Sequence, residues 1–427
     1  MMIAIFYLSL FFFALIAFLN IRLAGWLLLM LLPTYLLRTQ IWFIPTTWLE
    51  LAIYILALIT FISLVRSAQL KNTLLLIWRN YKPLWWAVLF WFLAATIATI
   101  ISPDLRLSAG VLKGWWFDPI LFLLVSLILI KNKSDLKYVI TGLLGSGALV
   151  AIWGLLEYIF NFGMQADGLL NSVYKPANYV AMLVVPIIFL GWGELKNSFT
   201  LRRRILISFL ISLQLVALWY TKSYGGFLGL VAGIIILLVF ISDKKIKKIA
   251  TIIFLFLCLA GSLIIAGQSK FQKIINLTER NSLTTRLQIW EISLELLKQK
   301  PILGVGLGNF YQPYRAQAFA MFQPPLEWEV VKAHNLFLNI WLEVGLLGLL
   351  AFSYLIFIYG KTVYKLLHQN LDSLDWWYLA GSLSALIATL THGLLDTPYF
   401  KNDLSILFYF ILFLPAILLY FRTKSID

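Results

Sequence analysis

The chain has 427 residues, of which 61% are hydrophobic and only 12% are charged, about half the charged fraction usual in soluble globular proteins. So few polar side chains cannot cover the surface of a water-soluble fold of this length, so the composition indicates a protein embedded in lipid. The net charge of +15 comes from 34 Lys and Arg against 19 Asp and Glu. No basic cluster is interleaved with aromatic residues in a polar domain, so we expect membrane lipids and no nucleic acid as partners. The single cysteine, Cys258, excludes an intrachain disulfide and a Cys-based metal site.

Thirteen apolar runs approach or reach the length of about 20 residues that a membrane-spanning helix needs. The first run has no basic residue before Arg22, which favours a retained membrane helix over a cleavable signal peptide. Three runs are short, so the sequence predicts an all-α bundle of 12 or 13 transmembrane helices. The runs are 2–19, 23–37, 48–65, 84–101, 116–130, 138–160, 178–193, 205–221, 226–242, 249–267, 335–359, 376–395 and 404–421.

The basic residues divide between the two sets of loops that connect these runs. Twenty Lys and Arg lie in one set, six lie in the short loops of the other set, and eight lie in the long loop 268–334. Long loops cross the membrane largely regardless of charge, so the short loops decide the orientation. We therefore predict that the C-terminus and the basic set are cytoplasmic and that loop 268–334 is external. The basic set comprises loops 20–22, 66–83, 131–137, 194–204, 243–248, 360–375 and 422–427.

The long loop 268–334 is the only sizeable polar region. Apolar residues recur in it at spacings of three and four, which predicts a helix of about five turns ending before Pro301. We expect the stripe formed by Leu283, Leu287, Trp290, Leu294 and Leu297 to face the bundle or the membrane surface. After this helix, Gly304, Gly306 and Gly308 permit tight turns and a close approach of the backbone to a ligand.

Two residues of the loop are candidates for chemistry, and each has an ordinary structural alternative. His334 closes the loop just before Asn335, and histidine is a side chain that can exchange a proton near neutral pH. It could equally be an interfacial histidine that binds a loop carbonyl. Arg286 lies on the predicted helix and Arg280 precedes it, and arginine can clamp a diphosphate. Both arginines could also be solvated residues on the flank of the helix.

Two further positions could bind a substrate. The hairpin from Lys222 through Tyr224 to Gly226 joins two predicted spans, so its backbone and Lys222 could contact a ligand phosphate, or Lys222 could extend to the lipid headgroups. Glu343 lies nine residues after His334, which on a continuous helix is about 13 Å further into the bundle. A carboxylate at that depth is either a helix-packing partner or part of a polar pocket.

Several signals are absent from the sequence. There is no Asp-x-Asp pair and no Walker sequence, and the three histidines, 334, 368 and 392, have no Cys or carboxylate at metal-ligand spacing. The glycines after Pro301 follow a helix and no strand, unlike a dinucleotide-binding fingerprint. The sequence therefore predicts no cofactor and no catalytic metal.

The stretch from Arg286 to Gly348 resembles the conserved region of the O-antigen ligase and O-antigen polymerase superfamily. The matching letters are Arg286 and Trp290, the segment Pro301–Phe310, then Ala333-His334-Asn335 and Glu343-Val-Gly-Leu-Leu-Gly348. The resemblance covers about a seventh of the chain closely. It divides the chain into N-terminal membrane helices, 1–200, and a ligase-like region, 201–427.

The resemblance implies a glycosyltransferase on the outer face of the bacterial cytoplasmic membrane. Such an enzyme transfers a glycan from an undecaprenyl diphosphate carrier to an acceptor hydroxyl, with inversion at the sugar carbon and without metal. The family's catalytic arginine and histidine correspond to Arg286 and His334. We expect substrate, the diphosphate or the glycan, to bind at Tyr224, Gly304, Gly306, Asn335 and Glu343. A second family arginine is usual in a Ser-Arg-Gly hairpin, where this chain has Ser223-Tyr224-Gly225. We expect Lys222 or Arg280 to supply the missing charge.

Two other functions compete with this interpretation. The segment Gly114–Asp118 is similar to the tryptophan-rich signature of protein oligosaccharyltransferases, but the order of its letters differs and the metal-binding carboxylates are missing. A transporter for lipid-linked sugars should show internal symmetry and ionisable groups near the midplane. Glu343 is the best candidate for such a group, and no symmetry is visible, so the transferase is the favoured hypothesis.

Overall fold

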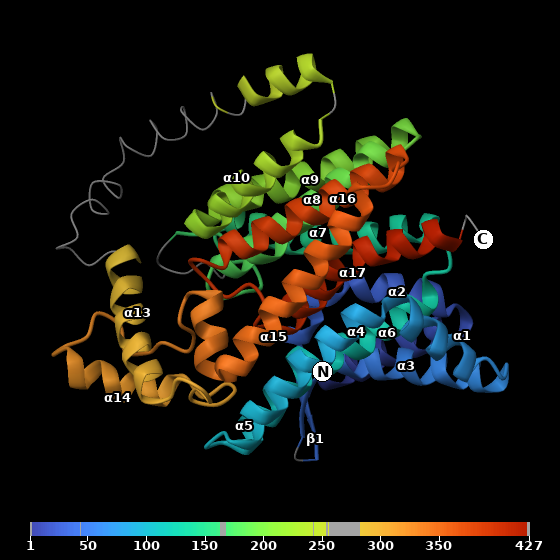
Figure 1. The fold of residues 1–427 in the computed structure, drawn as a ribbon. Helices are drawn as coiled ribbons and strands as arrows, with labels where there is room; N and C mark the ends of the chain where they lie inside the picture. Colours follow the sequence, from blue (N-terminus) through green and yellow to red (C-terminus); the bar gives the residue numbers. More distant parts are fainter. Residues whose placement is uncertain are drawn as a thin grey trace.

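The computed structural model describes residues 2–42, 44–162, 168–241, 243–252, 255 and 282–424, and these residues form mainly helices (Figure 1). One small antiparallel hairpin, β1–β2, interrupts the helices. Its strands and the helices that precede the long loop are β1 Arg38–Ile41, β2 Ile44–Thr47, α1 Met2–Leu19, α2 Ile21–Met30, η1 Leu32–Leu36, α3 Trp48–Arg66, α4 Leu70–Ile100, α5 Leu105–Leu112, η2 Lys113–Phe117, α6 Asp118–Leu129, η3 Lys133–Asp135, α7 Leu136–Phe160, α8 Asn178–Asn197, α9 Leu201–Thr221 and α10 Tyr224–Val239. The helices that follow are α13 Ser282–Gln299, α14 Tyr311–Met321, α15 Leu336–Leu367, α16 Ser373–His392 and α17 Asn402–Lys424.

The predicted all-α membrane bundle is confirmed. Within the described residues, eight helices are long and apolar enough to cross a membrane, and three shorter apolar helices accompany them. The run 116–130 is the second part of a 25-residue span, because a π-helical turn joins α5 to α6. Cys258 and most of the run 249–267 lie outside the described residues. Helices from 1–200 and 201–427 share one apolar core, with α8 packed on α16 and α4 on α15, so the division near residue 200 stays a prediction.

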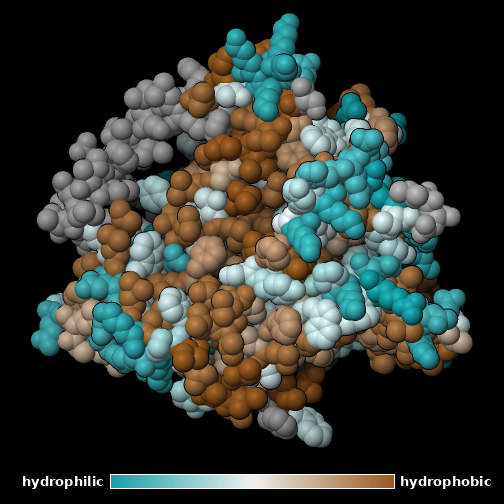
Figure 2. Space-filling view, viewed as in Figure 1, coloured by the Kyte–Doolittle hydropathy of each residue, from teal (hydrophilic) through white to brown (hydrophobic). Residues whose placement is uncertain are grey.

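Charged side chains pair at the two ends of the bundle. At one end, Asp375 binds Lys133 and Arg422 at 2.7 and 3.1 Å, and all three residues come from loops or helix ends predicted to be cytoplasmic. At the other end, which we call the site end, Lys113 binds Glu50 at 2.5 Å. Apolar residues cover the middle of the face in Figure 2 between two hydrophilic regions. These ion pairs therefore bring three of the loops predicted to be cytoplasmic to one end.

Two long helices depart from the predicted runs because their backbones break. α4 begins at Leu70, inside a predicted loop, and its backbone leaves helical geometry at Tyr81, just before Pro83. α15 breaks at Gly345, whose φ of 76° favours glycine. A Cβ at Gly345 would lie 2.4 Å from the carbonyl oxygen of Ile302, so the glycine-rich segment of the long loop packs against the break. Glu343 therefore lies near the end of a short helical segment that begins at Leu336, and the membrane-spanning part of α15 follows the break.

The described part of the long loop forms a helical unit at the site end, where α13 and α14 lie beside the start of α15 (Figure 1). α13 has the predicted length and ends before Pro301. Of the predicted apolar stripe, Leu297 is buried, whereas Leu287 and Leu294 are exposed, so their contact with the membrane surface stays a prediction. The face that packs on α14 and α15 is turned by about one residue and consists of Ile289, Ile292, Ser293, Leu296 and Leu297.

Candidate functional site

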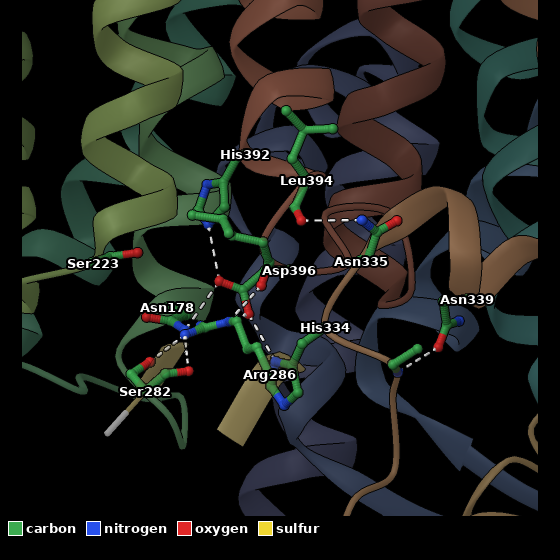
Figure 3. Close-up of polar contacts among 12 residues, drawn as sticks. Asn178, Ser223, Ser282, Arg286, His334, Asn335, Asn339, His392, Leu394 and Asp396 are labelled. Carbon is green, nitrogen blue, oxygen red and sulfur yellow. Dashed lines mark hydrogen bonds and ion pairs between the residues drawn. The ribbon is translucent and has the colours of Figure 1, made fainter. Parts of the chain in front are cut away.

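The Asp396 carboxylate is the centre of a buried polar cluster at the site end (Figure 3). Asp396 follows α16 and is 2% exposed. One of its oxygens accepts a hydrogen bond from Asn178 Nδ2 at 3.0 Å, and His392 Nε2 lies 3.4 Å from the same oxygen. The other oxygen lies 2.9 Å from His334 Nδ1 and 3.6 Å from Arg286 Nη2. Four segments that are far apart in the sequence therefore meet at one carboxylate.

These neighbours keep Asp396 ionised. Burial opposes ionisation, but the hydrogen bond with His334, the nearby His392 ring and the charge of Arg286 outweigh it. Together they hold the pKa of the Asp396 carboxyl well below its usual range. Because an ionised carboxylate only accepts hydrogen bonds, the proton between it and His334 lies on Nδ1.

His334 is held by its backbone as well as by Asp396. It has a φ of 47°, and the preceding residue, Ala333, is fixed by hydrogen bonds to Trp290 and Asn339 of 3.0 Å each. On the other side, the amide of Leu336 donates to the carbonyl of Gly393 at 2.6 Å. The side chain is nevertheless 37% exposed. With Nδ1 on Asp396, neutral His334 carries a lone pair on Nε2, the arrangement of a general base.

Arg286 projects from α13 into the same cluster. Its Nε donates to the carbonyl oxygen of Leu395 at 2.9 Å, and its Nη1 donates to the carbonyl and the hydroxyl of Ser282. The side chain is 13% exposed. Its Nη2 lies toward Asp396 and retains hydrogen-bonding capacity, because a guanidinium has five N–H groups. The structure thus brings together the two residues predicted for catalysis, and their roles stay predictions.

The α9–α10 hairpin abuts this cluster. A Cβ added to Gly225 would lie 2.4 Å from His392 Cδ2 and 3.4 Å from a carboxylate oxygen of Asp396, so glycine alone fits here. Lys222 ends α9 with a φ of 50° and is exposed, as is Tyr224. The hairpin in which the family usually has an arginine therefore lies at the cluster, while the predicted ligand contacts of Lys222 and Tyr224 stay untested.

The remaining predicted residues lie beside the cluster or apart from it. Asn335 caps α15 by accepting from Leu338 N, and its Nδ2 donates to the carbonyl oxygen of Leu394 at 3.1 Å. It therefore ties the His334 segment to the Asp396 loop. Arg280 lies outside the described residues.

The Glu343 carboxylate forms a separate buried unit. It is fully buried, pairs with Lys332 at 2.6 Å and accepts from the amide of Gly308 at 3.0 Å. Gly304 and Gly306 are also buried, and a Cβ at Gly304 would lie 2.2 Å from the carbonyl oxygen of Leu342. The close backbone approach made by these glycines is thus to other parts of this chain, and their predicted contact with substrate stays untested.

Sequence reasoning missed Asp396, His392 and Asn178. Asp396 lies 62 residues after His334, and only the folded chain joins them. A signal existed in the spacing of His392 and Asp396, four residues apart at the external end of a predicted span, where ionisable residues are costly. In the described part of the chain, no group of three or more His, Cys, Asp or Glu residues is arranged to hold a metal ion.

The fold and the cluster define a polytopic, helical membrane protein with a histidine, a carboxylate and an arginine gathered at one end of the bundle. Residues 207–353 match the family model described as O-Antigen ligase, which confirms the resemblance found in the sequence. The match includes the α9–α10 hairpin, Arg286 and His334, and it ends before Asp396.

Curated relatives support the same family. A Rickettsia conorii protein named "Putative polysaccharide ligase" is 27% identical over 259 residues, covering 55% of this chain and 60% of the relative. A Rickettsia typhi protein of the same description is 29% identical over 266 residues, covering 55% of this chain and 61% of the relative. The chain thus spans about three fifths of the length of these relatives.

Proposed function

We propose that the protein transfers a glycan from undecaprenyl diphosphate to an acceptor hydroxyl, on the outer face of the bacterial cytoplasmic membrane. The site end is then external and the C-terminus cytoplasmic, in accord with the charge distribution among the short loops. The observation that carries the proposal is the contact of 2.9 Å between His334 Nδ1 and the buried Asp396. It gives a partly exposed histidine the tautomer of a general base.

The proposed reaction is a single displacement. The acceptor oxygen forms a bond to the anomeric carbon, and the bond from that carbon to the diphosphate oxygen breaks. The hydroxyl proton passes to His334 Nε2, and the electron pair leaves with the diphosphate. One displacement inverts the configuration at the anomeric carbon, and a base of this kind contributes about 10² to 10⁴ in rate.

Cations of this chain would stabilise the leaving diphosphate. Because a diphosphate is already a good leaving group, the protein mainly supplies charge and position. Arg286 provides a guanidinium 3.6 Å from Asp396, and Lys222 on the adjacent hairpin provides a second, exposed charge. In this proposal Lys222 replaces the arginine that is usual in the hairpin.

Reconstitution in proteoliposomes tests the proposal. The purified protein would receive a labelled undecaprenyl-diphosphate glycan and candidate acceptors that carry lipid, glycan or peptide. A product with a new glycosidic bond of inverted configuration supports the proposal, and the productive acceptor distinguishes ligase, polymerase and protein-glycosylating activities. Movement of the intact donor across the bilayer without a new bond would instead identify a transporter.

A further inference from the structure

A second cationic site lies next to the Asp396 cluster. Lys401 follows Asp396 by five residues and directly precedes α17, and its Nζ lies 3.9 Å from the centre of the Tyr179 ring. Tyr179 adjoins Asn178, which donates to Asp396. The same Nζ is 5.9 Å from the ring of Tyr35. We call Lys401, Tyr179 and Tyr35 the lysine subsite.

In the described part of the chain, aromatic rings and no carboxylate within ion-pair distance surround the Lys401 ammonium. Among the described residues, its side chain makes no ion pair and no hydrogen bond, although it is half-buried. The carboxylates of Asp403 and Glu343 bind other residues. Asp403 accepts a hydrogen bond from the Tyr174 hydroxyl at 2.5 Å, and Glu343 pairs with Lys332. The position before α17 also adds the positive end of a helix dipole, which disfavours a cation.

Other groups around the subsite add positive charge. Lys332 Nζ lies 4.7 Å from the Phe400 ring, immediately before Lys401, and Arg38 lies on the exposed strand β1. Burial lowers the pKa of the Lys401 ammonium, Asp403 opposes the shift, and the charges of Arg38 and Lys332 add to it. The Tyr35 hydroxyl is buried without a hydrogen-bond partner in the described residues. A partly desolvated ammonium that makes no ion pair among the described residues is an arrangement that an anion stabilises.

We infer that the lysine subsite binds a phosphate group of a substrate whose reacting atoms lie at His334. This inference rests on the proposed function and names a chemical feature of its substrate. Two sources can supply this phosphate, namely the diphosphate of the donor and a phosphate on the acceptor. The aromatic rings beside Lys401 would contact the neighbouring sugar or lipid surface.

Binding measured without turnover tests the subsite. The protein in nanodiscs would be titrated with undecaprenyl diphosphate, with a phosphorylated glycolipid and with the same glycolipid after phosphatase treatment. Lys401→Gln should weaken binding of one phosphorylated probe by about tenfold, whereas Lys401→Arg should stay within about threefold of wild type. Weaker binding of undecaprenyl diphosphate assigns the anion to the donor, and weaker binding of the phosphorylated glycolipid assigns it to the acceptor.

Controls separate this inference from the proposed function. Lys365→Gln removes an exposed lysine of α15 at the opposite end and should leave binding unchanged. Arg38→Gln, on the exposed strand, should weaken binding of the same probe. It replaces Lys401→Gln as the test variant if Lys401→Gln fails to fold. Unchanged affinity of Lys401→Gln and Arg38→Gln for both phosphorylated probes overturns the subsite. His334→Ala should bind normally, and its undiminished glycan transfer would overturn the proposed chemistry while leaving the subsite standing.

Discussion

The substitution Asp396→Asn removes the charge at the centre of the cluster while preserving its shape. The Asp396 carboxylate oxygen lies 2.9 Å from His334 Nδ1 and keeps the proton of the imidazole on that nitrogen. The side-chain amide of an asparagine can donate as well as accept a hydrogen bond, so it would not fix the proton there. The histidine then loses the preference for the tautomer that leaves Nε2 free. Losing such a carboxylate in a catalytic triad costs about 10⁴ in kcat. We expect Asp396→Asn to lose about 10² to 10⁴ in kcat, or about 3 to 5 kcal/mol of transition-state stabilisation, with little change in KM for the donor.

The assay is glycan transfer in proteoliposomes at matched protein levels, with the melting temperature as a check on folding. Asp375→Asn is the matched control, because Asp375 is also buried and bound to two cations but lies at the opposite end of the bundle. It should lower stability without a specific loss of kcat. In a His334→Ala background, Asp396→Asn should have little further effect, because the two residues act as one unit. A folded Asp396→Asn protein with kcat within about threefold of wild type would refute this reasoning.

Three further results are expected. Gly225→Ala places a methyl group 2.4 Å from the histidine ring at the end of α16 and should cost about 1 to 3 kcal/mol of stability together with activity. Lys332→Met leaves the fully buried carboxylate of Glu343 unpaired and should cost about 3 to 5 kcal/mol, much of which Glu343→Gln in the same chain should restore. The depressed pKa of Asp396 means that its stabilisation is present above the unfolded value of about 3.9 and is lost as pH falls through the folded value. The melting temperatures of wild type and Asp396→Asn should therefore converge only below about pH 4.

Each of these results has a contrary outcome. Gly110→Ala is the control for Gly225→Ala, because a Cβ added at Gly110 would meet no neighbouring group within 4 Å among the described residues. Equal losses of stability at both glycines would disprove close packing of the hairpin. A double variant of Lys332 and Glu343 no more stable than Lys332→Met alone would show that the buried charge is not the cause. Convergence of the melting curves already between pH 8 and pH 6 would contradict a low pKa for Asp396.

The helices were predictable because lipid imposes long apolar runs, and the grouping of the loops followed from their charges. The break at Gly345 was not predictable, since it depends on packing against Ile302, more than forty residues earlier. The residues of α13 that pack inside the protein were not predictable for a similar reason. Several apolar residues of that helix fit more than one stripe, and contacts with α14 and α15 select Ile289 and Ile292.

The candidate site was predictable in part. The family motif and side-chain chemistry predict His334 and Arg286 as catalytic residues, and the fold brings both to one carboxylate. Asp396 carried no local motif, so only tertiary structure joins it to residues 62 and 110 positions earlier. Gly304 and Glu343 share the same motif letters, yet the contacts described for them are within the protein. Motif letters alone do not separate residues that touch a substrate from residues that hold a loop in place.

The central claim is that His334, positioned by Asp396, removes the acceptor proton during glycan transfer. Its most direct test is single-turnover transfer from labelled undecaprenyl-diphosphate glycan by wild type, His334→Ala and Arg286→Ala at equal amounts of folded, inserted protein. The account predicts that both variants lose the rate of product formation by at least about 10². Transfer at the wild-type rate by folded His334→Ala would contradict it.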